Sequence, residues 1–189
     1  PMIYNLDGDG RYHLPSDSGQ DTWRPETPVV MVSWECAFAY ASWLRDHSHR
    51  PWRLLSEWEW EKAARGVDGR RFPWGNRFDP AWCRMSTSTG TQPMISEIGE
   101  HRVDCSPYGV RATAGNVAEW CSTAYREFPD VVVGTHVRPK ISTDPGPRVC
   151  RGGHWLAKQG ACATHARTYE QPSHRSAHVG FRVARSLPE

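Results

Sequence analysis

Two cysteines bracket a pair of glycines near the end of the chain, in the stretch RVCRGGHWLAKQGAC at residues 148–162. Thiolates are soft ligands, and a two-coordinate Cu(I) site needs two of them to converge. The same stretch could instead form the floor of a pocket that only binds. The first question is therefore whether these residues predict a thiol active site or a binding site.

The chain has six cysteines and no C-x-x-C pair, so the usual zinc and thioredoxin spacings are absent. They are Cys36, Cys83, Cys105, Cys121, Cys150 and Cys162. Cys150 lies on an expected strand, so its approach to Cys162 depends on the geometry of the intervening loop. An even number of cysteines permits disulfides, although no secretion signal is visible. Each cysteine has a structural interpretation as well, because a buried free thiol behaves as a small apolar group.

Four of the nine histidines lie after the glycine pair, at positions 154, 165, 174 and 178. Iron or zinc would need two or three of them to converge with a carboxylate. His174 and His178 have helical spacing, but Pro172 and Ser173 favour a loop there. The pattern favours pocket-lining or exposed histidines over a metal site. The Asp7–Gly10 run DGDG lacks the further carboxylates of an EF-hand and predicts a tight turn.

The segment between the glycine pair and residue 180 mixes aromatic rings with adaptable polar groups, which is typical of binding surfaces. Loops held on a rigid scaffold commonly carry such sites. The alternative is a solvated loop. The candidate ligand-binding residues are His154, Trp155, Lys158, Gln159, His165, Tyr169, Glu170, Arg175 and His178.

Two segments in the first third of the chain predict helices that follow extended or turn residues. Residues 28–34 read as a short apolar strand, and Ser33 can cap a helix that continues to about Arg45. In residues 51–66, Ser56 and Glu59 have the spacing of a capping box, and Gly66 fits the residue after the helix. Further strands are expected after Gly115, at the start of 148–155, and over 178–185, with an irregular insert between the last two.

The composition predicts one compact, loop-rich domain over residues 1–189. Apolar residues make up 38%, yet there are ten Trp, 16 Gly and 15 Pro, which argues against disorder. Because the chain begins at Pro1, we expect it to be a fragment of a longer protein. The net charge of +2 indicates no nucleic-acid partner. No apolar stretch approaches the length of a membrane helix, and the compartment stays open between bacterial cytoplasm and cell surface.

Six stretches resemble, in the same order, the sulfatase-modifying-factor family, also called the formylglycine-generating-enzyme domain. They are PVVMVSW, RLLSEWEWEKAARG, GRRFPWGN, SPYGVRATAGNVAEW, RVCRGGHW and VGFRVAR. The resemblance implies an α+β fold of the irregular, C-type-lectin-like type with little regular secondary structure. It also implies that Arg167 and Arg182 are scaffold residues. The stretches YHLPSDSGQDTW, FDPAWC and SPYGVRATAGNV look most like the branch fused to bacterial Ser/Thr kinases.

The resemblance implies several functions, because the family is mixed. Some members are oxidases that convert a sulfatase cysteine to formylglycine with copper held by two cysteines. Others are iron sulfoxide synthases, and others only bind ligands, as kinase-fused domains or as variable proteins of diversity-generating retroelements. Counted forward from Gly152–Gly153, the two copper ligands correspond to Ala157 and Cys162. The first thiolate is thus missing, and Cys162 is expected to lack a partner sulfur.

The resemblance also implies calcium sites. Around GNVAEW the matching positions are Ala112, Gly115, Val117 and Glu119. Ala112 has no side-chain oxygen where the family has one, which weakens a site that needs six to eight oxygens. Glu119 could instead pair with an arginine. A second family site, near residues 81–84, lacks its asparagine and carries Arg84.

Together these features predict a non-catalytic domain that binds a protein or small-molecule ligand through its C-terminal loop. It would act as the sensor module of a fused kinase or as a retroelement-diversified protein. The alternative is a copper-dependent oxidase that uses Cys162 with an unconventional second cysteine. The sequence establishes no cofactor. Gly115, Val117 and Glu119 are the candidate calcium ligands, and copper is expected only if the chain is the alternative oxidase.

Overall fold

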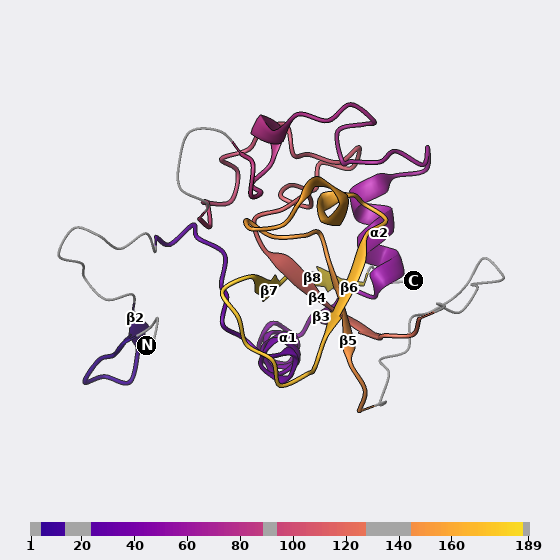
Figure 1. Ribbon diagram of the computed structural model, residues 1–189. Coiled ribbons are helices and arrows are strands. Elements are labelled where there is room, and N and C mark those ends of the chain that lie inside the picture. Colours follow the sequence, from indigo (N-terminus) through magenta and orange to yellow (C-terminus); the bar gives the residue numbers. More distant parts are fainter. Residues whose placement is uncertain (1–4, 14–23, 89–93, 128–144, 187–189) are drawn as a thin grey trace.

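The structure is a computed structural model, and it describes residues 5–13, 24–88, 94–127 and 145–186 (Figure 1). Regular elements are short and separated by long connections, as the composition predicted. The elements of the described ranges are β1 (Asn5–Leu6), β2 (Tyr12–His13), α1 (Trp34–Ser48), β3 (Trp52–Leu54), α2 (Glu57–Arg65), η1 (Pro80–Trp82), β4 (Ala118–Ala124), β5 (Arg148–Arg151), η2 (Gln159–Cys162), β6 (Arg167–Glu170), β7 (Val179–Phe181) and β8 (Val183–Arg185).

The N-terminal hairpin β1–β2 closes around the DGDG run. One carboxylate oxygen of Asp7 accepts hydrogen bonds from the backbone N–H groups of Asp9 and Arg11, at 3.0 and 2.8 Å. An aspartate that bonds to the backbone two residues ahead is typical of a turn. The predicted tight turn is confirmed.

The helix α1 begins where the sequence predicted, but the strand before it does not form. The Ser33 hydroxyl accepts the Cys36 N–H and caps the helix. The helix runs to Ser48, past the predicted end at Arg45. Residues 28–33 are irregular, because Met31 has a left-handed φ of 59° and its N–H bonds to Ser176 O instead of a strand ladder.

The capping box of α2 is confirmed: the Ser56 side chain accepts from the Glu59 N–H, and the Glu59 carboxylate accepts from the Ser56 N–H. Gly66 follows the helix at φ 76°, a value that favours glycine. Trp60 is 1% exposed and Trp58 is 38% exposed, so the two indoles lie on different faces. Residues 52–54, which precede the Ser56 cap, form the short strand β3.

The central sheet has the strand order β6-β5-β4-β7, with β4 and β7 parallel and the other pairs antiparallel. The strands predicted after Gly115 and at residue 148 are β4 and β5. The strand predicted over 178–185 is divided: β7 joins the central sheet, and β8 pairs with β3 in a separate two-stranded sheet. The expected irregular insert contributes the edge strand β6.

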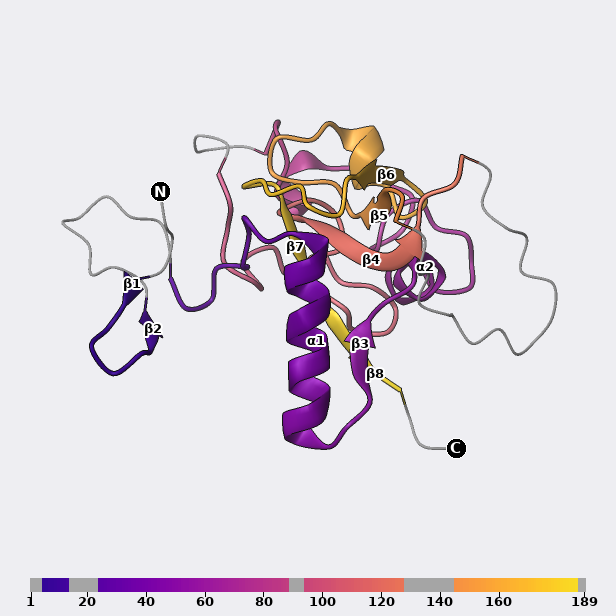
Figure 2. The ribbon, with the colours of Figure 1, turned by 90° about the horizontal axis from the view of Figure 1, so that it is seen from below.

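The helix α1 packs along the strands with its buried face, and Figure 2 shows it upright beside β3, β7 and β8. Trp34, Ala37 and Ala41 on that face join Trp120 of β4 in one apolar cluster. Both indole N–H groups are used: Trp34 donates to Cys121 O, and Trp120 donates to Val32 O. Buried indoles usually find such partners, and here they fix the helix against the sheet.

Buried ion pairs connect α2 to the sheet. The Arg167 guanidinium donates to both oxygens of Glu57, at 2.5 and 3.0 Å, and Arg151 donates to Glu61. Charged groups this deep need such partners, so the pairs position α2 over β5 and β6. The scaffold role expected for Arg167 agrees with this geometry. Within the described residues, none of the helices is both long and apolar enough to cross a membrane.

Candidate functional site

The glycine pair after β5 is shaped by its neighbours. Gly152 and Gly153 have φ values of 96° and 70°. A Cβ on Gly153 would lie 2.9 Å from the sulfur of Cys162, and a Cβ on Gly152 would lie 3.0 Å from the Trp60 ring. Both contacts are too close for a side chain. The glycines therefore let the chain pass close to the Trp60 ring and the Cys162 sulfur.

Positions 157 and 162 come together as the count from the glycine pair predicted. Ala157 and Cys162 are 6% and 0% exposed and belong to one buried cluster with Cys83, Met85 and Ala114. An alanine methyl therefore stands beside the Cys162 thiol, where the resemblance implies a second cysteine.

The expectation that Cys162 lacks a partner sulfur is wrong. Cys83, which directly follows η1, is fully buried in the same cluster as Cys162. The neighbouring Cys162 thiol and burial raise the pKa of the Cys83 thiol far above its usual value. Cys83 comes from far earlier in the chain, so no local spacing rule could find it. Cys150, weighed as the substitute, packs in another cluster against Trp120.

Three of the predicted ligand-binding residues form an aromatic group on the surface. The rings of His154 and His178 stack with centroids 4.6 Å apart, and Trp155 meets His178 edge-on at 5.1 Å. Burial and the nearby His178 lower the pKa of His154. The Trp155 indole N–H donates to Ala177 O at 3.1 Å, so the indole is fixed while all three rings stay partly exposed.

The other predicted ligand residues lie elsewhere. Tyr169 stacks on Tyr125 at 4.1 Å, and Glu170 lies 3.9 Å from the His174 ring nitrogen. Arg175 contacts the Cys36 sulfur near the start of α1. Lys158, which precedes η2, and His165, which follows it, are exposed, and Gln159, the first residue of η2, is half-buried.

The residues expected to hold calcium surround Glu119, whose carboxylate is already engaged. Arg182 donates to both oxygens of Glu119 at 2.5 Å, and the Trp60 indole donates at 2.6 Å. The same guanidinium donates to the carbonyl oxygens of Arg111 and Ala112, both at 3.1 Å. Arg182 thus occupies oxygens of the kind that calcium would use, as the arginine alternative predicted.

The loop before Glu119 is tightly built. Ala112 has a left-handed φ of 55°. A Cβ on Gly115 would lie 2.1 Å from Arg84 O, so only glycine fits there. Val117 is 7% exposed and packs with Trp155. Within the described residues no three or more His, Cys, Asp or Glu side chains converge as a metal group. Calcium at Gly115, Val117 and Glu119 stays a prediction.

Asp104 supports this loop from inside. It is 2% exposed, and its carboxylate oxygens accept the backbone N–H groups of Thr113 and Ala114 at 3.2 and 3.0 Å. Burial raises the pKa of Asp104 to about 7, although the two hydrogen bonds oppose the rise. Its charge also contributes to the raised pKa of Cys83. Asp104 is thus coupled to both the loop and the buried thiols.

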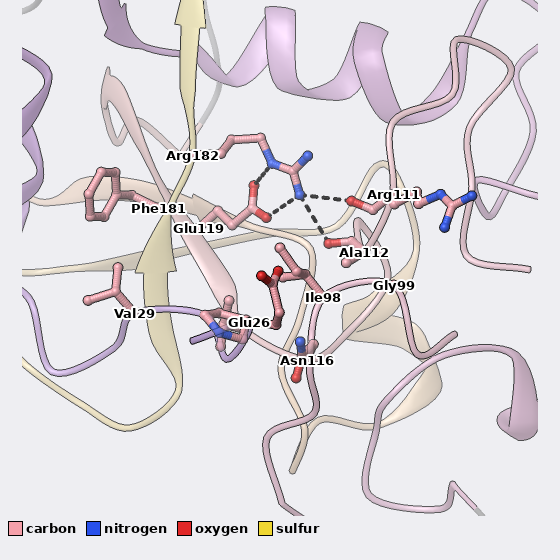
Figure 3. Close-up of a pocket in the computed structure, with 12 residues that line it drawn as sticks. Glu26, Val29, Ile98, Gly99, Arg111, Ala112, Asn116, Glu119, Phe181 and Arg182 are labelled. Carbon is pink, nitrogen blue, oxygen red and sulfur yellow. Dashed lines mark hydrogen bonds and ion pairs between the residues drawn. The ribbon is translucent and has the colours of Figure 1, made fainter. Parts of the chain in front are cut away.

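A cavity of about 500 Å³ opens beside the Glu119–Arg182 pair (Figure 3). Apolar and charged groups line it together: Glu26, Pro28, Val29, Ile98, Gly99, Arg111, Ala112, Asn116, Val117, Glu119, Phe181 and Arg182. None of the nine predicted ligand residues is among them. The family motifs quoted from the sequence contain several of these residues, among them Val29, Arg111, Glu119 and Arg182. Glu26 and Ile98 lie outside those motifs.

The sequence and the fold are similar to those of known proteins. Residues 9–187 match the family described as the sulfatase-modifying factor enzyme 1-like domain. The chain is 36% identical over 180 residues to a formylglycine-generating enzyme of Thermomonospora curvata, covering 85% of this chain and 56% of the relative. The chain therefore belongs to the sulfatase-modifying-factor family. It spans little more than half the length of that relative.

The relatives differ in their functions. An inactive Cα-formylglycine-generating enzyme 2 of Bos taurus is 33% identical, with coverage of 85% of this chain and 50% of the relative. The serine/threonine-protein kinase pkn1 of Chlamydia caviae is 32% identical, with 85% and 24% covered. Family membership alone thus leaves the activity of this chain undecided.

Two solved structures share the fold. PvdO from Pseudomonas aeruginosa matches with a TM-score of 0.76 at 24% identity, covering 98% of this chain and 72% of that one. Treponema denticola variable protein 1 matches at 0.69 and 24%, with 89% and 74% covered. The predicted α+β fold of the formylglycine-generating-enzyme type is confirmed.

Proposed function

We propose that this chain is a non-catalytic recognition domain of the sulfatase-modifying-factor family. The observation that carries the proposal is Ala157, which packs in one cluster with Cys162 at the position where the resemblance implies a copper-binding cysteine. A methyl group offers no electron pair to a metal, so this pair of positions cannot form a dithiolate copper site. The existence of an inactive relative at 33% identity is consistent with this function.

The proposed recognition surface is the loop that follows Gly153. His154, Trp155 and His178 present partly exposed rings whose positions are fixed by stacking and by the Trp155 hydrogen bond. Rigid aromatic groups lose little conformational entropy when they bind. The exposed side chains of Lys158 and His165 add polar contacts near them in sequence. A protein surface or a small molecule with apolar and polar faces suits this combination.

The setting of the domain is part of the proposal. The similarity to a Chlamydia kinase supports a role as the sensor module of a Ser/Thr kinase. The likeness to a Treponema variable protein shows a common fold, and a retroelement-diversified protein is the other setting proposed. Both settings use the domain for binding, and the sequence neighbouring this chain in its genome distinguishes them.

The test compares copper binding and turnover. Protein refolded under reducing conditions, so that its cysteines are thiols, is loaded with Cu(I) and assayed for oxidation of the cysteine in a sulfatase-motif peptide, alongside Ala157→Cys and Ala157→Ser. We expect no turnover and no stoichiometric copper in the wild type, and one retained Cu(I) in Ala157→Cys. Ala157→Ser has a similar volume but no thiolate, so it controls for packing. Peptide oxidation by the wild type would overturn the proposal.

A second candidate function is the copper-dependent oxidase, because Cys83 lies against Cys162. Two converging thiols are the donor set that Cu(I) takes, and copper would supply the oxygen chemistry. The raised pKa of Cys83 works against this function, since both thiols must lose a proton to bind. In this case Cys83→Ala abolishes copper binding, whereas Cys121→Ala, an equally buried control in another cluster, leaves it intact.

A further inference from the structure

We infer that Cys83 and Cys162 form a disulfide bond that fastens the loop after Gly153 to the segment after η1. This inference goes beyond the proposed function and does not depend on it. It concerns how the loop is held, whatever the loop binds.

The two sulfurs are already positioned for each other. Cys83 and Cys162 are both 0% exposed and lie in one cluster, and the neighbouring Cys162 thiol contributes to the raised pKa of Cys83. The Gly153 backbone lies close against the Cys162 sulfur, since a Cβ on Gly153 would lie only 2.9 Å from it. The Cys83 backbone is fixed as well, since its carbonyl accepts the Ser88 hydroxyl at 2.6 Å.

The surroundings favour an apolar bridge over two thiols. Met85, Ala114 and Ala157 complete the cluster, and Trp74 and Phe78 pack against it. A disulfide carries no donor and no charge, so it fits such a site without a polar partner. The raised pKa of Cys83 shows that a thiolate is strongly disfavoured there.

The bridge would complete a set of links along the same loop. The Ala157 carbonyl accepts both the Ser86 N–H and the Ser86 hydroxyl, at 3.1 and 2.9 Å. On the other side of Cys162, the Thr164 hydroxyl donates to the carbonyls of Arg70 and Arg71. Cys162 lies between these two attachments. A covalent link here would also close a long loop, which is where disulfides restrict the unfolded chain most.

The chemistry balances with a disulfide oxidant such as oxidised glutathione. A thiolate of one cysteine attacks the oxidant, a mixed disulfide forms, and the second cysteine displaces the reduced thiol. Two protons and two electrons leave the protein, and the oxidant gains them as two thiols. Because neither sulfur is exposed in the fold, the exchange takes place during folding. Once formed, the bond is shielded from reductants.

The test begins with the wild-type chain, refolded with oxidised and reduced glutathione, alkylated under denaturing conditions and digested without reduction. We expect a cross-linked peptide containing Cys83 and Cys162, a chain lighter by two hydrogen atoms, and four alkylated cysteines. Dithiothreitol should break the bond only when denaturant is added. Six alkylated cysteines, a cross-link between other residues, or stoichiometric Cu(I) at these thiols would each overturn the inference.

Variants extend the test. Cys83→Ala and Cys162→Ala should each remove the cross-link and lower the Tm by about 10 °C relative to the oxidised wild type. Cys121→Ala removes an equally buried thiol from a different cluster and should keep the cross-link. If Cys83→Ala does not fold, the peptide map of the wild type still decides the question. The copper and turnover assays at Ala157 use protein refolded under reducing conditions, in which this bond does not form, so the two proposals fail separately.

Discussion

Two regions of this domain stand where the family resemblance implies metal ligands, and in both an alanine has replaced one ligand. In the region of Ala112, Arg182 bonds to the Glu119 carboxylate and to the carbonyls of Arg111 and Ala112. At Ala157 the remaining thiol is met by Cys83. The Arg182 guanidinium neutralises the Glu119 carboxylate and forms a structural ion pair with it. The second thiol, Cys83, instead leaves Cys162 able to form a disulfide or to bind copper. The loss of one ligand therefore has opposite consequences in the two regions.

The largest effect is expected at the first region. Arg182→Leu leaves the Glu119 carboxylate buried without its cation, and we expect a loss of about 3–5 kcal/mol in the free energy of unfolding. Urea unfolding measures this. The double variant Glu119→Leu/Arg182→Leu removes both charges and should recover part of the loss. If Arg182→Leu is as stable as the wild type, the ion pair is not what holds this region.

The next effect concerns Asp104, which connects the two regions. Its folded pKa of about 7 lies above the unfolded value, so the folded state binds the extra proton. Protonated Asp104 therefore stabilises the folded state fully below about pH 4. This stabilisation, on the order of 2–4 kcal/mol, is lost as the pH rises through 7. Asp104→Asn should abolish this trend.

The comparison between the wild type and Asp104→Asn isolates that group. His154 changes stability in the opposite direction, because its lowered pKa disfavours protonation in the folded state. Urea unfolding at several pH values between 4 and 8 gives both curves, and their difference removes the His154 contribution. A difference that does not change with pH would contradict the assignment to Asp104.

A smaller effect is expected at the second region. Gly153→Ala puts a methyl group 2.9 Å from both the Cys162 sulfur and the Ala161 carbonyl oxygen, at a φ that alanine disfavours. We expect a loss of about 2–3 kcal/mol, measured by thermal unfolding under reducing conditions. Gly153→Ala/Cys162→Ala should lose less than the sum of the single variants, since one contact is removed. If the losses of the two single variants simply add, the strain of Gly153→Ala lies in the backbone and not in the contact with Cys162.

The smallest effect separates backbone strain from calcium binding in the first region. Ala112 has φ 55°, which glycine and asparagine adopt more readily. Ala112→Gly and Ala112→Asn should each stabilise the fold by about 0.5–1 kcal/mol. Excess calcium should raise the Tm of Ala112→Asn, which regains a side-chain oxygen, but not that of Ala112→Gly. Equal calcium responses would contradict the predicted site.

The sequence could predict features that depend on neighbouring residues. The caps at Ser33 and Ser56 formed as expected, because an N-cap bonds only within its own turn. Counting from the glycine pair also identified Ala157 and Cys162 as members of one site, because both follow the pair closely in sequence. The strand expected before α1 failed because a distant group, the Ser176 carbonyl, takes the Met31 N–H.

Features that depend on distant segments could not be predicted. The expected strand over 178–185 is divided at Arg182, because its side chain is drawn to Glu119 while the residues beyond it pair with β3. Cys83 was missed as a partner of Cys162, and so were Glu26 and Ile98 of the cavity. Each is brought to its site by tertiary packing, which no spacing pattern encodes.

The anchoring of the loop after Gly153 has a consequence for how this domain can evolve. Ala157, Cys162 and Thr164 point into the protein and hold the loop at three places, while Lys158 and His165 are exposed between and beside them. Residues that touch only solvent can be exchanged at little cost to folding. If the proposed binding function holds, exchanges at Lys158 and His165 would change the bound ligand while the buried residues keep the loop in position.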